Sequence, residues 1–275
     1  MKKLYRITQK YLNYLIANFF STILNFFNYK ITPNLSNLKK FDFDYSENTR
    51  RLVFRNNEKR FGKITIDTSF FKSNLCIKGK EISTNKSPYN LFGHRSGYTG
   101  LYYLLFSQIQ KKNLTIGEIG IYKNSSIKLW HEFFINSEIH GFEYDENLIQ
   151  NAINDKLANT FYHKINVKNP ISINEAFRKV NKKFDIIIDD STHLFDDQIN
   201  VIYNVKDYLN DNSILIIEDI YKERKEYKEE MYFNKISPII NEFENIFFVE
   251  TSHINNFTAN WKNEKILVLI KNEKL

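Results

Sequence analysis

Acidic side chains and one histidine follow two apolar stretches of the sequence. Asp189 and Asp190 end the first stretch, His193 comes three residues after Asp190, and Glu218 and Asp219 end the second stretch. In a parallel sheet the carboxyl ends of neighbouring strands meet at one edge, so these groups would converge there. Clustered carboxylates repel one another, and a divalent cation with oxygen ligands relieves the repulsion; Mg²⁺ is the first expectation. The alternative is structural: Asp189 or Asp190 caps the following helix, and Glu218 is a solvated loop acid.

An earlier apolar stretch contains Glu118 and Gly120 and leads into a second candidate site. Gly120 lets a ligand approach the backbone of a strand-to-helix turn. A dinucleotide-binding turn has a second glycine where Tyr122 stands, which counts against a pyrophosphate lying on this turn. Glu143 follows Glu118 by about 25 residues, a spacing that suits an acid on ribose hydroxyls. The pattern therefore favours a nucleoside-containing ligand over an ordinary turn flanked by solvated acids.

The elements that must hold these residues alternate between strand and helix from Ser87 onward. Such alternation is typical of a parallel sheet with crossover helices. Ser172 and Glu175 form a capping box that is expected to open one of the helices. The last two strands are joined by a short loop and predict a closing hairpin. Strands are expected at residues 114–121, 139–143, 161–165, 184–189, 213–219, 246–250 and 265–270, and helices at 126–133, 146–157, 172–180 and 197–209.

The sequence before this pattern divides into two further parts. Residues 41–87 read as a small extension of short strands and turns, with Gly62 and Gly79 as turn points. We find no residues there that indicate chemistry. Three parts are therefore expected: an N-terminal segment 1–40, the extension 41–87, and a catalytic domain 88–275.

Residues 1–40 contain seven Lys and Arg side chains and no Asp or Glu, whereas the rest of the chain holds equal numbers of basic and acidic residues. A nucleic-acid binder carries its basic stripe on the folded domain, so we expect no nucleic-acid partner. From Leu12 to Phe27, apolar residues recur at the spacing of an amphipathic helix. Such a helix could pack on the domain or on a second copy in a homo-oligomer, lie at a membrane surface, or span a membrane. Repeated asparagines, Asn18 among them, count against the span.

The single cysteine, Cys76, cannot form an intramolecular disulfide, and no paired Cys or His spacing indicates structural zinc. A reducing compartment fits this usage. We therefore expect a cytoplasmic protein, with or without contact of residues 1–40 with the inner leaflet of the membrane.

Three segments resemble class I S-adenosylmethionine-dependent O-methyltransferases: residues 118–126, residues 185–198 and residues 216–219. The resemblance is strongest to the macrocin and mycinamicin sugar O-methyltransferases and their cephalosporin-hydroxylase-like relatives, and it runs from about His94 to the last residues. It implies an α/β fold: a Rossmann-like, doubly wound, seven-stranded sheet with a C-terminal antiparallel hairpin. It also implies methyl transfer to a hydroxyl group, of a sugar or another glycan-type small molecule, with S-adenosylmethionine and Mg²⁺ as cofactors.

The resemblance also implies a role for each site residue. Glu118 and Gly120 would hold the methionine part of the cofactor, and Glu143 its ribose hydroxyls. His193 would be the general base that takes the proton of the acceptor hydroxyl, which an imidazole can do near neutral pH. The predicted cofactor-binding residues are Glu118, Gly120, Ser126, Glu143, Asn166 and Asp189, and the predicted metal ligands are Asp190, Glu218 and Asp219.

Some residues depart from the pattern of that family. Tyr122 and Asn124 stand at glycine positions, Asn166 stands where an aspartate is usual, and Ser191 replaces a glycine. Two other classes of function stay open. A nicotinamide-dependent enzyme acting on nucleotide sugars would need a glycine-rich turn and a Tyr-x-x-x-Lys relay, which Tyr203 does not begin. A non-catalytic nucleoside-binding relative would keep the fold without the converging carboxylates.

Overall fold

The computed structural model describes residues 43–44, 53–54, 61–67, 71–90, 94–258 and 261–272. The predicted N-terminal helix lies outside these ranges. The chain divides into two units, the first of which consists of Met1–Tyr45 and Val53–Arg55. Its described part is an antiparallel pair of short strands, β1 (Phe43–Asp44) and β2 (Val53–Phe54). The predicted divisions after residues 40 and 87 stay predictions.

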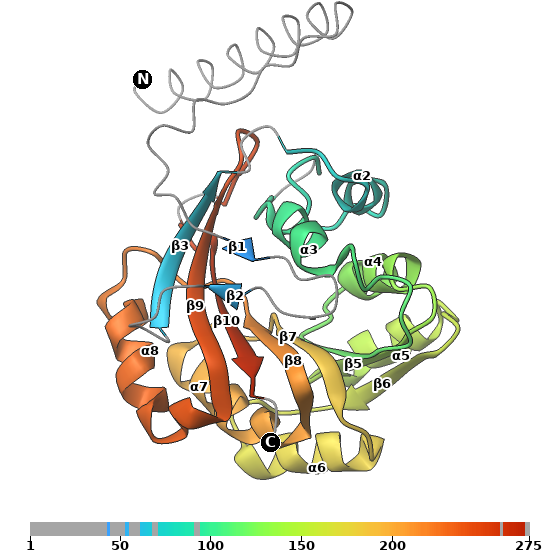
Figure 1. Ribbon diagram of the computed structural model, residues 1–275. Coiled ribbons are helices and arrows are strands. Elements are labelled where there is room, and N and C mark those ends of the chain that lie inside the picture. Colours follow the sequence, from blue (N-terminus) through green and yellow to red (C-terminus); the bar gives the residue numbers. More distant parts are fainter. Residues whose placement is uncertain are drawn as a thin grey trace, which may run out of the picture. The chain divides into compact units, whose positions relative to one another are not determined.

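The second unit is built on one sheet of eight strands in the order β3-β9-β10-β8-β7-β4-β5-β6 (Figure 1). Strands β6, β5, β4, β7 and β8 pair in parallel, and β10 is antiparallel to both β8 and β9. All seven strands expected from the sequence form, and the Rossmann-like doubly wound sheet with its antiparallel closing pair is confirmed. The strands are β3 (Phe61–Asp67), β4 (Thr115–Ile119), β5 (Glu138–Glu143), β6 (Thr160–Lys164), β7 (Phe184–Asp189), β8 (Leu209–Ile217), β9 (Phe243–Ser252) and β10 (Lys265–Lys271).

The eighth strand, β3, and the helix α2 (Asn74–Glu81) both come from the predicted extension. β3 pairs in parallel with β9, so this part of the extension is integral to the sheet. The turns expected around Gly79 are wrong, because residues there form α2, which begins where the Ser73 hydroxyl accepts the Cys76 N–H at 3.1 Å. Gly79 serves packing instead: a Cβ atom there would lie 2.9 Å from that of Ser87. Gly62 lies within β3 and is not a turn point either.

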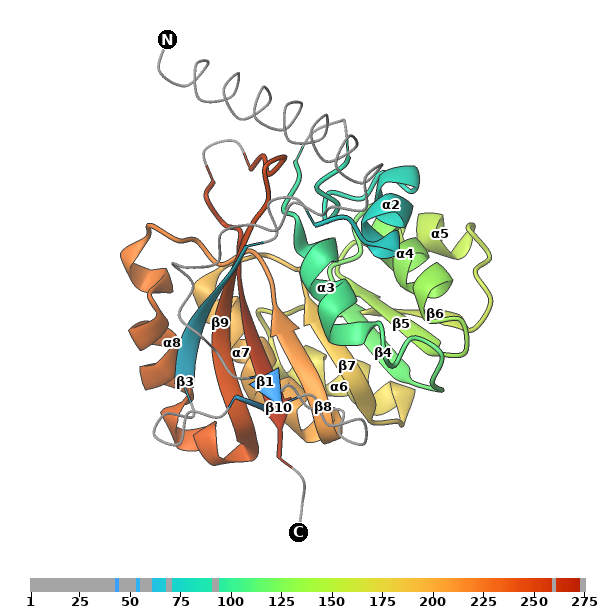
Figure 2. The ribbon, with the colours of Figure 1, turned by 45° about the horizontal axis from the view of Figure 1, so that its top comes forward.

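Helices cover both faces of the sheet. One face is packed against α6, α7 and α8 through buried side chains such as Phe177, Val201 and Tyr232. On the other face, α3 and α4 meet through the rings of Tyr102 and Trp130, whose centroids are 5.3 Å apart. Figure 2 shows α3 in front of the sheet and α7 behind it. The helices are α3 (Tyr98–Phe106), α4 (Ser125–Phe133), α5 (Glu146–Ile153), α6 (Pro170–Val180), α7 (Phe195–Val205) and α8 (Glu229–Ile236), with short 3₁₀ turns at Lys206–Tyr208, Lys225–Tyr227 and Ser237–Glu242.

Two local predictions need correction. Helix α6 begins at Pro170, and its cap is Asn169, whose side-chain oxygen accepts the Ile171 N–H at 3.0 Å. The expected capping box at Ser172 is therefore wrong, and that hydroxyl instead accepts the N–H of Asn166 at 3.0 Å. The loop between β9 and β10 is not short, because it runs over residues 253–264.

Among the helices in the described ranges, none combines the length and the apolar character that crossing a membrane requires.

Candidate active site

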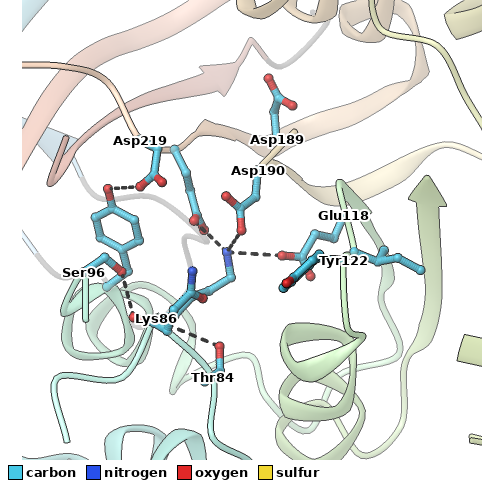
Figure 3. A network of polar contacts seen from close by, with 12 residues as sticks. Thr84, Lys86, Ser96, Glu118, Tyr122, Asp189, Asp190 and Asp219 are labelled. Carbon is cyan, nitrogen blue, oxygen red and sulfur yellow. Dashed lines mark hydrogen bonds and ion pairs between the residues drawn. The ribbon is translucent and has the colours of Figure 1, made fainter. Parts of the chain in front are cut away.

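The carboxyl ends of β4, β7 and β8 bring three of the predicted acids together. The Asp190 N–H donates to the Ile119 carbonyl at 2.8 Å, and the Glu218 N–H donates to the Asp189 carbonyl at 2.9 Å. Strand pairing thus continues one residue beyond the end of each strand. As a result, the side chains of Asp190 and Glu218 lie beside that of Glu118 on β4 (Figure 3).

A lysine that the sequence did not indicate lies between these acids. Lys86 Nζ is 2.6 Å from Asp190 Oδ2, 2.6 Å from Glu218 Oε2 and 3.2 Å from Glu118 Oε1 (Figure 3). Its side chain is only 1% exposed. Lys86 precedes Asp190 by 104 residues and stands in a polar turn, where a lysine ordinarily faces solvent. No local pattern in the sequence could have found it.

Helix α3 supplies two hydroxyl groups to the same acids. The Tyr98 hydroxyl lies 2.8 Å from Asp219 Oδ1 and 2.9 Å from the Asn263 carbonyl oxygen. One helical turn further on, the Tyr102 hydroxyl donates to Glu218 Oε1. Because Lys86 contacts the other oxygen of Glu218, both oxygens of this buried carboxylate are paired.

His193 faces the two aspartates from the turn after β7. Its Nε2 atom is 3.6 Å from Asp219 Oδ2 and 3.9 Å from Asp190 Oδ1. Each of the three residues offers one ligand atom, and these atoms lie within 4.8 Å of one another. His193 Nδ1 is buried and has no hydrogen-bond partner among the described residues. The geometry suits either proton exchange at Nε2 or a cation held between the aspartates.

Asp189, a predicted cofactor-binding residue, turns away from this group. In Figure 3 its side chain points away from Lys86, whereas that of Asp190 points toward it, as expected for successive residues along a strand. The Ser191 hydroxyl donates to Asp189 Oδ1 at 2.6 Å. Burial raises the pKa of Asp189 to about 6. The structure thus directs the Asp189 side chain away from Lys86 and toward Ser191.

The charges around Lys86 are strongly coupled. Burial by itself lowers the pKa of Lys86, but the charges of Asp190, Glu218 and Glu118 together raise it well above its usual range. Burial raises the pKa of Glu118 and Glu218, and the charge of Lys86 acts against this. Burial also raises the pKa of Asp219, where His193 acts in the opposite direction. Lys86 therefore stays an ammonium ion facing three acids.

A cleft of about 420 Å³ opens at the carboxyl ends of β4, β5 and β6. Such a volume lies in the range of small-molecule sites. Gly120, Glu143, Asn166 and Asp190, four of the predicted site residues, line it together with Tyr122. Glu118 and Ser126 are buried beside it, and the second oxygen of Glu118 accepts the indole N–H of Trp130 at 2.8 Å.

The carboxylate of Glu143 is held by backbone groups. Its Oε2 atom accepts the N–H groups of Ile121 and Tyr122, both at 3.1 Å. Its Oε1 atom accepts those of Tyr144 at 2.7 Å and Asp145 at 3.1 Å. Glu143 therefore fixes the turn after β4 and the start of α5, in addition to any contact with a ligand in the cleft.

Gly120 is required by the close approach of two turns. Its φ is +88°, and a Cβ atom there would lie 2.3 Å from the carbonyl oxygen of Asp190. The absence of a side chain thus lets the turn after β4 pack on the turn after β7. Tyr122 and Asn124, at the positions where a glycine was expected, also have positive φ values of 43° and 64°.

A second cavity, of about 360 Å³, opens on the other residues of the acidic group. His193 and Asp219 line it, together with the aromatic side chains of Phe257 and Trp261 and the polar side chain of Asn85. The Trp261 side chain is 56% exposed, and its ring lies 5.9 Å from that of His94. None of these flanking residues was predicted as a site residue from the sequence, because they lie outside the helices and strands, in segments without periodic patterns.

Comparison of this chain with known proteins assigns it to one family and shows that it shares the fold of solved methyltransferase structures. A family model described as "Methyltransferase domain" matches residues 124–267, which is more than half of the chain. No curated protein matches.

Among solved structures, the chain is similar to the MycE methyltransferase from the mycinamycin biosynthetic pathway in complex with Mg, SAH and mycinamycin VI. The identity is 14% and the TM-score 0.55, over 74% of this chain and 56% of that chain. A second MycE structure, with Mg and SAH, gives 15% identity and a TM-score of 0.55 over 74% and 55% of the two chains. A putative O-methyltransferase from Klebsiella pneumoniae gives 11% and 0.49, over 74% and 92%. The chain spans little more than half the length of MycE, and the likeness to MycE shows a common fold.

Proposed function

Because this chain belongs to the methyltransferase domain family, we propose that it transfers a methyl group from S-adenosylmethionine to a hydroxyl group. One observation carries the proposal: two separate cavities are both lined by residues of the same acidic group. Asp190 lines the cleft at β4, β5 and β6, and His193 and Asp219 line the second cavity. The cleft would hold the cofactor, and the second cavity would hold the acceptor.

On the cofactor side, the support is the set of polar residues at the strand ends. Glu143 and Asn166 line the cleft where a ribose and a base would lie. Glu118 and Ser126 are buried at the turn beside Gly120, where the methionine part would lie. Asp189 is the exception among the predicted residues, because its side chain turns away from this group, and we leave it out of the proposed cofactor site.

On the acceptor side, His193 would act as the general base. A hydroxyl is a weak nucleophile until its proton is removed. With S-adenosylmethionine bound, its sulfonium would supply the methyl group and leave as the neutral thioether, and Nε2 of His193 would take the proton of the acceptor hydroxyl. Asp219, 3.6 Å from Nε2, would stabilise the imidazolium that forms. Orientation of the two reactants is the larger contribution that such a site can make.

A Mg²⁺ ion fits two of its three predicted ligands. Mg²⁺ commonly binds through one or two carboxylates and keeps several waters, which Asp190 and Asp219 could satisfy. Glu218 fits less well, because Lys86 and Tyr102 already pair both of its oxygens. When bound, the ion would orient the acceptor and lower the pKa of its hydroxyl.

The acceptor that we propose is a sugar or another glycan-type molecule. The second cavity places the rings of Trp261 and Phe257 near the carboxylate of Asp219. An aromatic wall suits the C–H face of a sugar ring, and a few polar groups fix its orientation. The resemblance of the sequence to sugar O-methyltransferases supports the same class.

The direct test is calorimetry of the purified chain with S-adenosylhomocysteine and with NAD⁺. We expect binding of S-adenosylhomocysteine and none of NAD⁺, because Tyr122 stands where a pyrophosphate-binding turn has glycine. Binding of NAD⁺ without S-adenosylhomocysteine would refute the proposal and favour a nicotinamide-dependent enzyme. Release of methylated product from a panel of sugars then tests the acceptor class.

A substitution of Glu143 tests the proposed contact of its carboxylate with the ribose of the cofactor. Glu143→Ala should weaken S-adenosylhomocysteine binding about ten- to a hundredfold, because hydrogen bonds to a charged group contribute about 1.5–3 kcal/mol. Glu143 also fixes two turns, so thermal unfolding of the variant must be recorded alongside. The exposed neighbour Glu146, paired with Lys164, gives the matched control Glu146→Ala. An unchanged dissociation constant in folded Glu143→Ala removes Glu143 from the cofactor site.

A further inference from the structure

Both backbone groups of Lys86, its N–H and its carbonyl, make hydrogen bonds that fix the residue in place. Its N–H donates to the Thr84 hydroxyl at 3.3 Å, and its carbonyl accepts the N–H of Thr99 in α3 at 3.1 Å. The side chain therefore enters the acidic group from a defined point. Its ammonium reaches three acids that come from three neighbouring strand ends, β4, β7 and β8 (Figure 3).

The position of this ammonium matters for any metal ion. A cation bound jointly by Asp190, Glu218 and Asp219 would need an oxygen from Glu218. Lys86 Nζ already contacts Glu218 Oε2 at 2.6 Å, and Tyr102 takes Oε1. A divalent ion brought to Glu218 would also meet the positive charge of Lys86 at close range in a buried setting, where repulsion is only weakly screened. Two other carboxylate oxygens face His193 and do not contact Lys86. They are Asp190 Oδ1 and Asp219 Oδ2.

We propose that Lys86 is a positioning residue that acts as the fixed cation of this site. It holds Glu118, Asp190 and Glu218 in the place of a metal ion, so Glu218 is not a metal ligand and any divalent ion is confined to Asp190 and Asp219. Lys86 contacts Glu118 beside the cofactor cleft and Asp190 beside His193. It therefore also fixes the position of the cofactor cleft relative to that of the acceptor cavity. The inference extends the proposed function, but its test does not depend on methyl transfer.

The first experiment measures Mn²⁺ binding by calorimetry, with no cofactor or acceptor present. Asp219→Asn should weaken Mn²⁺ binding by about tenfold or more, whereas Glu218→Gln should change it less than about threefold. Equal losses in the two variants would show that Glu218 is a ligand and would overturn the inference.

The second experiment removes the ammonium. In Lys86→Met, Asp190 and Glu218 lose their cation and become free to bind a metal, so Mn²⁺ affinity should rise by about tenfold or more, or a new site should form. The matched control is Lys265→Met, because Lys265 is also 1% exposed and contacts Glu229 at 3.2 Å, outside the acidic group. That variant should keep the Mn²⁺ affinity of the unaltered protein.

These measurements distinguish a variant that does not fold from a result that contradicts the inference. Near-ultraviolet circular dichroism shows which variants are folded, and Lys86→Gln replaces Lys86→Met if the latter does not fold. If the unaltered chain binds no Mn²⁺, a folded Lys86 variant must gain binding; no gain overturns the inference. Absence of S-adenosylhomocysteine binding or of methyl transfer would instead tell against the proposed function, and would leave the Mn²⁺ result standing.

Discussion

His193 and Asp219 share an unusual backbone conformation, with a φ of +58° for each. Residues other than glycine avoid this region, and exceptions gather at functional sites where the surrounding structure holds them. Here the holding contacts are visible: Tyr98 and His193 contact the Asp219 carboxylate, and the Tyr227 hydroxyl donates to the His193 carbonyl at 3.0 Å. The proposed general base, His193, and the carboxylate proposed to stabilise its imidazolium, Asp219, thus both lie in turns whose backbone conformation costs free energy.

Asp189→Asn should stabilise the protein near neutral pH. Burial raises the pKa of Asp189 from the ordinary 3.8 to about 6. The folded state therefore binds a proton more tightly than the unfolded state. The stability associated with that proton is complete below about pH 4 and is lost as the pH rises through about 6. An uncharged Asn avoids this loss, which is at most about 3 kcal/mol.

The measurement is urea unfolding of the variant and the unaltered protein from pH 4 to pH 7.5. We expect the difference in unfolding free energy to be small at the acid end and to reach about 1–3 kcal/mol in favour of Asn near pH 7. Asp196→Asn, at an exposed position in the first turn of α7, is the control. A difference that does not change with pH would mean that Asp189 titrates normally.

Gly120→Ala should disrupt the cleft. At φ +88° an alanine is strained, and its Cβ atom would lie 2.3 Å from the backbone oxygen of Asp190, which cannot move like a flexible side chain. We expect a loss of at least about 2 kcal/mol in unfolding free energy and weaker binding of S-adenosylhomocysteine. Lys123→Ala, in the same turn but exposed, should leave both unchanged. A stable Gly120→Ala protein with normal binding would contradict the packing described for this turn.

Helix α3 acts as the support of the acidic group. Tyr98 and Tyr102 lie four residues apart, on one face of the helix, and reach Asp219 and Glu218 with their hydroxyls. The same helix accepts no side-chain cap at its start, where Gly97 has a φ of +81°. Its position is held by these buried contacts, by the aromatic packing around Tyr102 and by the bond from the Thr99 N–H to the Lys86 carbonyl.

Tyr98→Phe tests this support. The change keeps the ring but removes the hydroxyl that fixes Asp219, so the aspartate gains freedom beside His193. We expect kcat for methyl transfer to fall about tenfold or more, with little change in the KM for S-adenosylmethionine and a loss of about 1–3 kcal/mol in stability. Tyr103→Phe, five residues further along the same helix, is the matched control for loss of a hydroxyl. Equal kinetics of the two variants would show that Tyr98 has no part in placing Asp219.

Elements with a strong local pattern could be predicted from the sequence, and contacts between distant segments could not. Strand β7 matches its expected bounds, because an apolar run closed by Asp189 is buried on both faces. Helix α2 was missed, since its eight residues include a glycine and two lysines and lack a clear apolar stripe. Lys86 was missed for a different reason. Two of its three acidic partners, Asp190 and Glu218, are more than a hundred residues away and directly follow β7 and β8, and nothing next to Lys86 in the chain signals burial.

The charge of the whole chain is unevenly divided. Residues 1–40 carry an excess of seven positive charges, and the remainder is formally neutral. One of two predictions for this segment is contact with anionic membranes, because each Lys or Arg near such a surface contributes about 1 kcal/mol and the apolar face of the expected helix would add burial. The competing prediction is that the same segment packs on protein, either on the domain or on a second copy.

Co-sedimentation with anionic liposomes separates these predictions. The full chain should pellet with the vesicles at low salt and less so at high salt, and a chain that starts at Phe41 should stay in the supernatant. Equal, negligible pelleting of both would discard the membrane prediction. Loss of an oligomer on truncation, measured by light scattering, would support packing on a second copy.

Strand β3 pairs with β9 from Phe61 opposite Ile246 to Asp67 opposite Ser252, and so covers one border of the sheet. A chain that starts after Asp67 would lack β3 and would leave the N–H and C=O groups along this edge of β9 without their partners. Exposed edge strands of this kind pair with strands of other molecules. We therefore expect a chain that starts between Asp67 and Lys86, which keeps the residues of the proposed site, to self-associate in a cell more than a chain that starts before Phe61.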